Sequence, residues 1–263
     1  MKTVTCATSL LAISLATGFV IADEITIPLH DGNAVDNFLY NNGPTTNFGP
    51  NGIFYYDNRG TLLDKGRPIM RFDLSTEVPP CSTITKVEYQ LWLVDYTFVD
   101  LNNGGAVVPW TFSLYPMKVD WEENTSNWNE RKPGVPWSVP GMVAGVDYEA
   151  AAASSLLVST PANRYISWDI TSLYMSWVNG TRPNYGFHLR GPDGDPAKTT
   201  SSGDTTDGVF RANSSEYADD FRRPHLVITF TPGSCACNAD FNGDGFLDFT
   251  DFDDFVGAFE AGC

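Results

Sequence analysis

The sequence predicts an all-β fold with one short helix, followed by a small C-terminal helical appendage. Short runs in which apolar and polar residues alternate, the period of a half-buried strand, recur along most of the chain. Residues 173–178 instead carry apolar side chains at helical spacing between two such runs. After residue 233 the composition changes abruptly to an acidic tail that is rich in phenylalanine. We therefore expect a β domain at 23–233 and a separate segment at 234–263.

Residues 1–22 are expected to be a secretory signal peptide. Lys2 precedes an apolar run from Ala7 to Ile21, and the run ends in residues that fit cleavage before Asp23. A membrane anchor is the alternative, but the run is shorter than the ~20 residues that a spanning helix needs. No later segment is apolar enough to span a membrane. The sequence thus predicts a secreted or cell-surface protein that is not membrane-spanning.

Two strands are predicted at 68–74 and 84–94. In the second strand, one set of alternate residues is apolar: Val87, Tyr89, Leu91 and Leu93. The opposite set contains Trp92 beside Glu88 and Gln90, which places a large aromatic side chain on the polar face. An exposed ring there can stack on the flat apolar face of a sugar. A loop that covers the ring would instead make it part of the core, and both interpretations stay open.

Further candidates for ligand binding lie on polar strand faces and in a loop. Arg71 shares the polar face of its strand, and Tyr115 shares the polar face of a strand predicted at 111–119. Trp137 stands in a proline-rich loop, where its ring is a second candidate for stacking on sugar. With two residues from a later strand, the predicted ligand-binding set is Arg71, Trp92, Tyr115, Trp137, His188 and Arg190.

The segment from 164 to 190 reads as a strand, a short helix and a second strand. Thr171 is the predicted N-cap, because its hydroxyl can accept a first-turn amide, and Asn179-Gly180 suits a left-handed helix end. The helix carries one apolar stripe, made by Leu173, Tyr174, Trp177 and Val178. In the second strand the polar face holds His188 and Arg190, and together with Arg71 these positive groups favour an anionic ligand.

Several motifs in this chain resemble those of a known family. The run SWDITSLYMSWVNGTRPNYGFHLR (167–190) is similar to the signature of the DNRLRE-type domain, which is grouped with family 96 carbohydrate-binding modules. Other segments that agree, in the order of the family, are DNFLYNNGPTTNFG (36–49), RPIMRFDLS (67–75), ITKVEYQLWL (84–93), MKVDWEENTSNWNER (117–131) and RPHLVITF (223–230). The resemblance covers roughly residues 30–231. It implies a jelly-roll-like antiparallel β-sandwich that binds polysaccharide and is not by itself an enzyme.

The tail carries the spacing of an EF-hand calcium loop. In DFNGDGFLDFTD (240–251), oxygen ligands fall at positions 1, 3, 5, 9 and 12, and these are Asp240, Asn242, Asp244, Asp248 and Asp251. Gly245 at position 6 permits the sharp turn, and Phe246 would add its backbone carbonyl. The pattern predicts calcium as a cofactor. Aspartate at position 12 resembles dockerin repeats, but a dockerin has two repeats and this chain has one, so docking to a cohesin-like partner is not expected.

Cysteine count and charge narrow the function further. Without the leader, four cysteines remain, Cys81, Cys235, Cys237 and Cys263, which predicts two disulfides with three possible pairings in an exported protein. The formal net charge is −16, with 32 acidic residues against 16 basic ones. This balance argues against nucleic acid as a partner, because phosphates would be repelled.

The function predicted from the sequence is that of a secreted, non-catalytic protein that binds a polysaccharide. Glu122 and Glu123 are the acid pair that suggests a glycosidase, but neighbouring residues on a strand point to opposite faces and do not easily flank one bond. A polysaccharide-degrading enzyme, lyase or hydrolase, remains the first alternative. A structural or adhesive cell-surface protein without a defined glycan ligand is the second.

Overall fold

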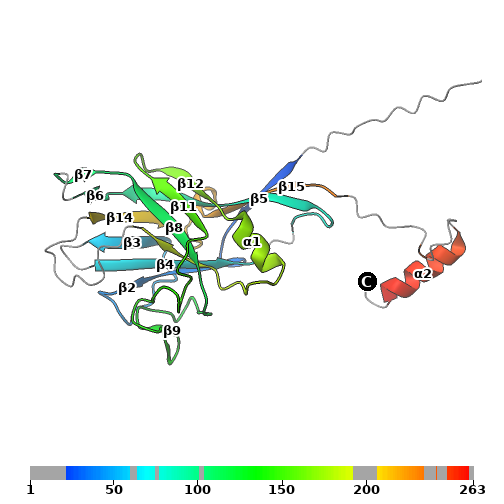
Figure 1. Cartoon of the computed structure of the whole chain (residues 1–263), viewed down its shortest axis with the longest axis horizontal. Coiled ribbons are helices and arrows are strands. Elements are labelled where there is room, and N and C mark those ends of the chain that lie inside the picture. Colours follow the sequence, from blue (N-terminus) through cyan, green and yellow to red (C-terminus); the bar gives the residue numbers. More distant parts are fainter. Residues whose placement is uncertain are drawn as a thin grey trace, which may run out of the picture.

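The structure is a computed structural model, and it describes residues 22–59, 64–74, 77–100, 104–191, 206–233, 241 and 248–260. These residues form a large antiparallel sheet, which curls into a sandwich-like body, and two α-helices (Figure 1). The all-β sandwich-like fold expected from the sequence is therefore confirmed.

The elements follow one another along the chain as strands with few interruptions. The strands are β1 (Asp23–Pro28), β2 (Ala34–Tyr40), β3 (Ile53–Arg59), β4 (Asp64–Phe72), β5 (Thr83–Tyr96), β6 (Val99–Asp100), β7 (Ala106–Val107), β8 (Trp110–Pro116), β9 (Glu130–Lys132), β10 (Val135–Pro136), β11 (Ser154–Val158), β12 (Arg164–Asp169), β13 (Phe187–Arg190), β14 (Thr206–Asn213) and β15 (His225–Thr231). The helices are α1 (Thr171–Val178), the 3-10 helix η2 (Asp220–Arg222) and α2 (Phe249–Glu260).

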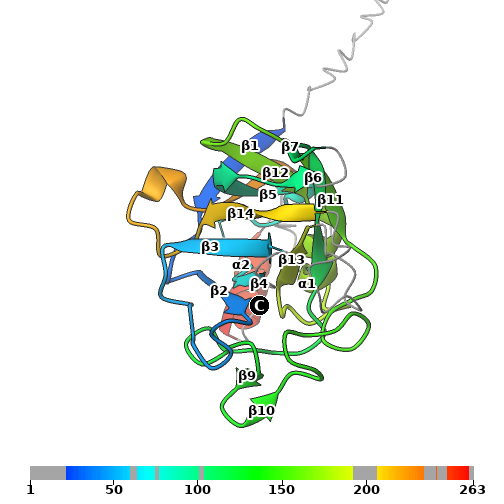
Figure 2. The same cartoon turned by 90° about the vertical axis from the view of Figure 1, so that its left-hand side faces the viewer.

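Hydrogen bonds join most strands into one curled sheet. Its order is β1-β15-β5-β14-β3-β4-β13-β8-β11, with β12 paired to β5, β2 paired to β4, and β6 joining β14 to β7. The short hairpin of β9 and β10 forms a separate sheet. Figure 2 shows how the sheet bends, so that strands distant in its order face one another across a common core. Curling in this way buries one face of the long strands, such as β5 and β4.

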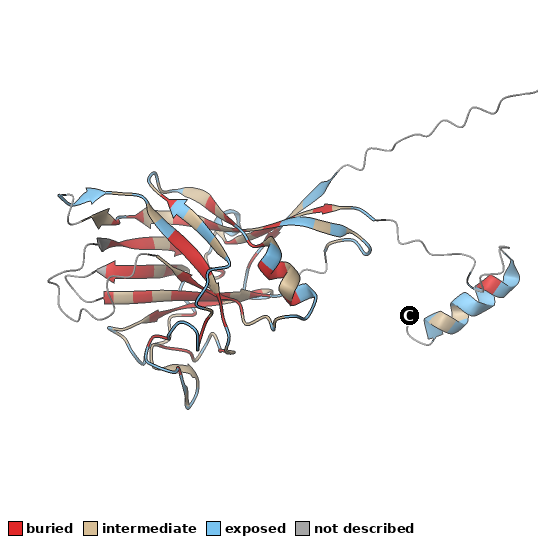
Figure 3. Cartoon of the chain, in the orientation of Figure 1, coloured by how far each residue is buried: buried red, intermediate tan, exposed pale blue. Residues whose placement is uncertain are grey.

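The main core lies between the facing layers, as the buried residues in Figure 3 show. Strand β5 contributes the alternate residues Val87, Tyr89, Leu91 and Leu93, all of which are buried as predicted. Helix α1 adds Leu173, Tyr174 and Trp177 to the same cluster, whereas Val178 at the end of the predicted stripe is exposed. Alternation along the strands therefore identified the inner face correctly.

The start of α1 differs from the prediction. Ile170 occupies the N-cap position and makes no side-chain cap, and Thr171 is the first helical residue. The Thr171 hydroxyl accepts the Val87 N–H of β5 at 2.9 Å and donates to Asp169 at 2.6 Å. The predicted N-cap role of Thr171 is therefore wrong, because its hydroxyl ties the helix to the neighbouring strand instead. The predicted end is confirmed, with Asn179 as the C-cap and Gly180 at a φ of +67°.

A second hydrophobic cluster lies on the outer side of β2 and β4. Its buried members are Leu39, Ile69, Met117, Trp121, Trp137, Met142 and Tyr148. Leu39 and Ile69 point away from the main core, because their strand neighbours Phe38 and Met70 belong to it. All the other members come from residues 117–150, which we call the cover segment. This part of the sheet is consequently buried on both faces.

The tail is a helix set apart from the sandwich. Helix α2 is drawn away from the β-sheet in Figure 1, and Figure 3 shows it exposed around most of its surface. The expected helical appendage is therefore present. Four of the six predicted calcium ligands lie outside the described residues: Asp240, Asn242, Asp244 and Phe246.

Two further expectations bear on export. Cys81 is disulfide-bonded, and Cys235, Cys237 and Cys263 lie outside the described residues, so the pairing stays a prediction. The proposed leader lies almost wholly outside the described residues as well. Within the part of the chain that is described, no helix has the length and apolar character to cross a membrane.

Candidate functional site

The candidate site lies on the outer face of three adjacent strands, β12, β5 and β15. Trp92 of β5 is paired directly with Tyr165 of β12, and Gln90 lies between Ser167 of β12 and His225 of β15. Leu91 and Leu93, the neighbours of Trp92 in β5, are buried in the main core, so the Trp92 ring lies on the outer face. We call Trp92, Tyr165, Phe221, Arg222 and His225 the aromatic patch.

Three rings of the aromatic patch, those of Trp92, Tyr165 and His225, contact one another in a row. The Trp92 and Tyr165 rings meet edge to face, with centroids 5.1 Å apart and planes at 85°. Tyr165 stacks on His225, with centroids 4.8 Å apart and planes at 27°. The Arg222 guanidinium carbon lies 5.1 Å from the centre of the Trp92 ring. Such contacts give the row a fixed shape before any ligand arrives.

Tyr165 positions the η2 turn beside this row. Its hydroxyl oxygen lies 2.6 Å from the Phe221 carbonyl oxygen and 3.0 Å from that of Arg223. Burial raises the pKa of Tyr165 to about 12, so the hydroxyl keeps its proton and remains a donor at neutral pH. Burial also lowers the pKa of His225, which favours the neutral imidazole. The rings in contact are therefore uncharged near neutral pH.

The η2 turn contributes the most exposed aromatic side chain of the described residues. Phe221 is 87% exposed, and its backbone N–H donates to the Asp219 carboxylate at 3.1 Å. Asp219 also lies 3.4 Å from the Arg222 guanidinium. The turn thus presents an open phenyl ring and a cation next to each other.

Polar groups continue the outer face along the strands. The Ser167 hydroxyl donates to the Glu88 carboxylate at 3.0 Å, and Lys86 forms an ion pair with Glu88 at 3.0 Å. Gln90 lies between these groups and the aromatic patch. A flat surface that combines rings with donors and acceptors can stack on an apolar ring face and hold hydroxyl groups at its edge.

The structure separates the six predicted ligand residues. Trp92 is in the aromatic patch, and the other five lie on the opposite side of the sandwich, on or next to β4, β8 and β13. There Arg190 lies between two tyrosine rings, 5.4 Å from the centre of Tyr115 and 5.5 Å from that of Tyr148. Its guanidinium donates to the Tyr148 hydroxyl at 2.9 Å. Arg190 and Tyr115 are thus brought together, but at a site remote from Trp92 in the sheet order.

Arg71 is engaged with the cover segment. Its guanidinium donates to Asp120 at 2.8 Å and lies 5.6 Å from the centre of the Trp121 ring. Lys132 binds the other oxygen of Asp120 at 2.7 Å. Burial alone would raise the pKa of Asp120, but Lys132 and Arg71 together lower it. This ion-pair group fastens the cover segment to β4.

Two of the predicted ligand residues are buried, which is a correction. Trp137 is 3% exposed and its indole N–H donates to the Asn127 carbonyl at 2.8 Å. His188 is 0% exposed, with its Nδ1 2.8 Å from the Pro68 carbonyl oxygen. The cover segment folds over this face of the sheet, so neither ring has a free surface. The expectation that both meet a ligand is wrong for that physical reason.

Sequence reasoning missed four members of the aromatic patch: Tyr165, Phe221, Arg222 and His225. Tyr165 alternates with Ser167 and Asp169 on a polar face, which is the same signal that singled out Trp92. Phe221 is a lone aromatic in the charged run ADDFRR, and this too indicates exposure. The sequence could not show that these residues lie near Trp92, because the elements that carry them are far apart in the chain.

The acid pair at 122–123 lies in a loop and not on a strand, so the strand argument does not apply to it. Glu122 accepts from the Thr125 hydroxyl at 3.0 Å, whereas Glu123 accepts the Asp36 N–H at 2.9 Å. The two carboxylates therefore point to different neighbours and do not flank a common space.

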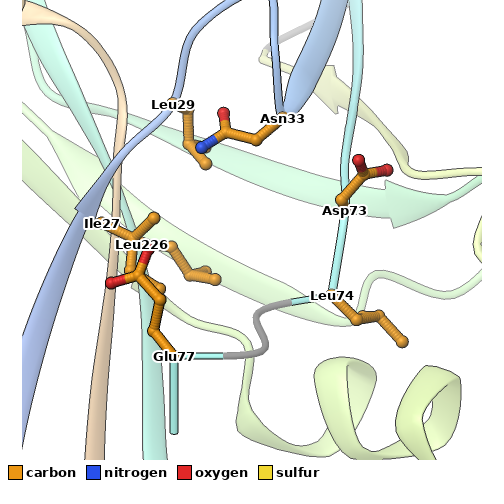
Figure 4. A pocket seen from close by; sticks show the side chains of 7 residues that line it. All are labelled: Ile27, Leu29, Asn33, Asp73, Leu74, Glu77 and Leu226. Atoms are coloured by element: carbon orange, nitrogen blue, oxygen red, sulfur yellow. The ribbon is translucent and has the colours of Figure 1, made fainter.

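A cavity of about 260 Å³ lies elsewhere in the sandwich (Figure 4). Its lining residues are Ile27, Leu29, Asn33, Asp73, Leu74, Glu77 and Leu226. The Asn33 side chain is hydrogen-bonded to the backbone there, since its amide donates to the Pro28 carbonyl at 3.1 Å. The lining has no aromatic ring and none of the predicted ligand residues, so this cavity is a weaker candidate than the aromatic patch.

The two described calcium-loop residues stand at the start of α2. The Asp248 N–H donates to the Asp251 carboxylate at 2.9 Å, and Asp248 accepts the Thr250 N–H at 2.8 Å. The hydrogen bonds from Thr250 lower the pKa of Asp248. Among the described residues there is no group of three or more histidine, cysteine or acidic side chains that could hold a metal ion. Calcium binding stays a prediction, since most of its proposed ligands lie outside that part of the chain.

No protein-family model matches this chain, and a search of curated proteins finds no match either.

Proposed function

We propose that this protein is a secreted, non-catalytic carbohydrate-binding protein that holds a polysaccharide on its aromatic patch. The observation that carries the proposal is the row of rings on the outer sheet face, next to a turn that presents the open ring of Phe221. Sugar rings have apolar C–H faces and polar edges, so they match a surface of rings bordered by hydrogen-bonding groups.

The surroundings of the patch favour sugar over a purely apolar ligand. Arg222 has a side chain that is half exposed, and its contact with Asp219 is a long 3.4 Å. Its remaining N–H groups can donate to hydroxyls or to a sugar carboxylate. Gln90 and Ser167 add neutral polar groups on the same face. An anionic polysaccharide remains part of the proposal, with Arg222 in the role that the sequence assigned to Arg71, His188 and Arg190.

A binding screen against neutral and anionic polysaccharides tests this function. We expect Phe221→Ala and Trp92→Ala to weaken binding by about 1–3 kcal/mol each, the scale of losing one aromatic contact. Phe221→Ala should leave the melting temperature nearly unchanged, because the ring is exposed. Phe249→Ala in α2 is the matched control, since it removes a phenyl ring that is also largely exposed, at 73% against 87% for Phe221, and lies outside the patch.

Three results would contradict the proposal. Equal losses of affinity in the Phe221→Ala and Phe249→Ala variants would show non-specific adhesion, as expected for an adhesive surface protein. Absence of binding to every polysaccharide would also favour a structural role. Release of shortened sugars from any substrate would identify an enzyme.

A further inference from the structure

Three acidic side chains from distant parts of the chain meet beside β2, where Asp36 is buried and Glu123 and Glu216 are half-buried. Asp36 comes from β2, Glu123 from the cover segment, and Glu216 from the turn that follows β14. Asp36 is 4% exposed and its N–H donates to the Glu123 carboxylate at 2.9 Å. Ser215 connects Asp36 and Glu216, because its hydroxyl contacts both carboxyl groups. We call Asp36, Glu123 and Glu216 the acid cluster.

The contacts of Ser215 indicate a proton on one of these acids. Its hydroxyl oxygen lies 2.9 Å from Asp36 Oδ2 and 2.7 Å from Glu216 Oε1. A hydroxyl carries one hydrogen, so it can donate to only one of two carboxylates. The second contact is a hydrogen bond only if the other carboxyl group is protonated and donates to Ser215.

The two glutamates point to the same conclusion. Burial and, after it, the negative charge of Glu123 raise the pKa of Glu216, so the two carboxyl groups act on each other. Glu216 Oε2 is buried, and no N–H or O–H donor of the described residues reaches it. The two contacts of Ser215 and the burial of Glu216 Oε2 therefore favour a bound proton in the acid cluster.

The charges around the acid cluster do not replace that proton. Asp31 adds a further negative charge near Glu123, and the cation that faces Glu123 is Arg71, which is already bound to Asp120. From β5 the buried Tyr89 faces Asp36, and it is neutral. Burial raises the pKa of all three acids, that of Glu216 to about 7, and the neighbouring Glu216 raises that of Asp36 further. Loss of the proton would place like charges beside one another, one of them buried and two half-buried, with no free cation facing them among the described residues.

We propose that the acid cluster is a proton-held lock that fastens the cover segment and the 214–217 turn to β2, and that it opens as the pH rises above neutrality. Below that point a shared proton joins the carboxyl groups. Above it, repulsion between the ionised carboxylates separates the segments that carry them. Glu216 also lines a cavity of about 510 Å³ together with Tyr55 and Tyr217, so opening of the turn changes the shape of this cavity.

The direction of the pH effect follows from proton linkage. A buried acid with a raised pKa keeps a proton that the unfolded chain has already released. Stability is therefore fully present below the ordinary glutamate pKa of 4.5 and is lost as the pH rises through about 7, the pKa of Glu216. If Glu216 bore the whole effect, the ratio of folded to unfolded protein would fall by at most about 300-fold across this range, and by less because solvent screens this half-buried side chain.

The experiment measures unfolding by denaturant between pH 5 and 9 in three proteins. The unmodified protein should lose stability over this range. The Glu216→Gln variant should lose much less stability over this range. Its amide N–H donates a hydrogen bond at every pH, whereas the carboxyl group donates only while it is protonated. Glu24→Gln changes an exposed acid on β1 and should keep the slope of the unmodified protein. If Glu216→Gln does not fold, Glu123→Gln places the same donor on the neighbouring acid of the cluster.

Hydrogen exchange locates the change. The amides of Ser215 and Asp36, which donate into the acid cluster, should lose protection at pH 8.5 relative to pH 6, after correction for intrinsic rates. Amides in β12 should keep theirs. The proposal is overturned if Glu216→Gln and the unmodified protein share one pH slope. It is equally overturned if added calcium restores full stability at pH 8.5, because the acids would then be a cation site.

Discussion

Truncation of Trp121 should release the cover segment while the sandwich stays folded. Trp121 is 0% exposed in the second hydrophobic cluster, and its indole N–H donates to the Tyr185 carbonyl at 3.0 Å. Trp168 is its match in the main core, at 1% exposed, with its indole N–H 3.0 Å from the Phe112 carbonyl oxygen. The two tryptophans thus differ in the cluster they occupy rather than in burial or bonding.

The expected loss of stability is the same at both sites, but its consequence differs. Replacement of a buried tryptophan by alanine costs about 3–5 kcal/mol, against about 5–15 kcal/mol for a whole domain. In Trp168→Ala this cost falls on the cluster that both layers of the sandwich share, so global stability should drop. In Trp121→Ala the loss weakens a cluster that holds one segment to one sheet face. Local opening of that segment should then require less free energy than unfolding of the whole domain.

Hydrogen exchange and limited proteolysis distinguish the two outcomes. Trp121→Ala should lose protection and become cleavable within the cover segment, while amides of β5 and β12 remain protected. Trp168→Ala should lose protection throughout the sandwich. Identical exchange patterns in the two variants would refute the reasoning, because the two clusters would then unfold as one cooperative unit.

Two further outcomes are expected. Tyr165→Phe removes the hydroxyl that binds the Phe221 and Arg223 carbonyls. This variant should bind polysaccharide several-fold more weakly and lose about 1 kcal/mol of stability. Unchanged affinity would show that the η2 turn is positioned without Tyr165. Removal of calcium by a chelator should reduce the exchange protection of α2 and leave the sandwich intact, because metal that binds only the folded loop stabilises it. Equal protection of α2 with and without chelator would contradict a calcium-held tail.

The sequence by itself determined the strand faces and the short helix. Alternation in β5 placed Val87 and Leu93 inside and Trp92 outside, because successive side chains of a strand must point to opposite faces. Helical spacing likewise located α1 and its glycine end. Local periodicity is a property of the backbone, so it can be read from neighbouring residues.

Local pattern failed where a second layer covers the sheet. The same alternation placed His188 on a polar outer face, which was correct for its direction but not for its exposure. Trp137 appeared to be a loop residue open to solvent, yet it anchors the segment that buries His188. Strand periodicity states which way a side chain points, and it carries no information about what packs there.

The tertiary structure alone assembled the aromatic patch and the acid cluster. Trp92 meets Arg222 and Tyr165 because β5 lies beside β12 and β15, and Asp36 meets Ser215 across 179 positions of sequence. The raised pKa of Glu216 exists only after burial has brought three carboxyl groups together. Such contacts depend on strand order and on the closure of the sheet, which arise from the packing of the whole chain rather than from any one stretch of it.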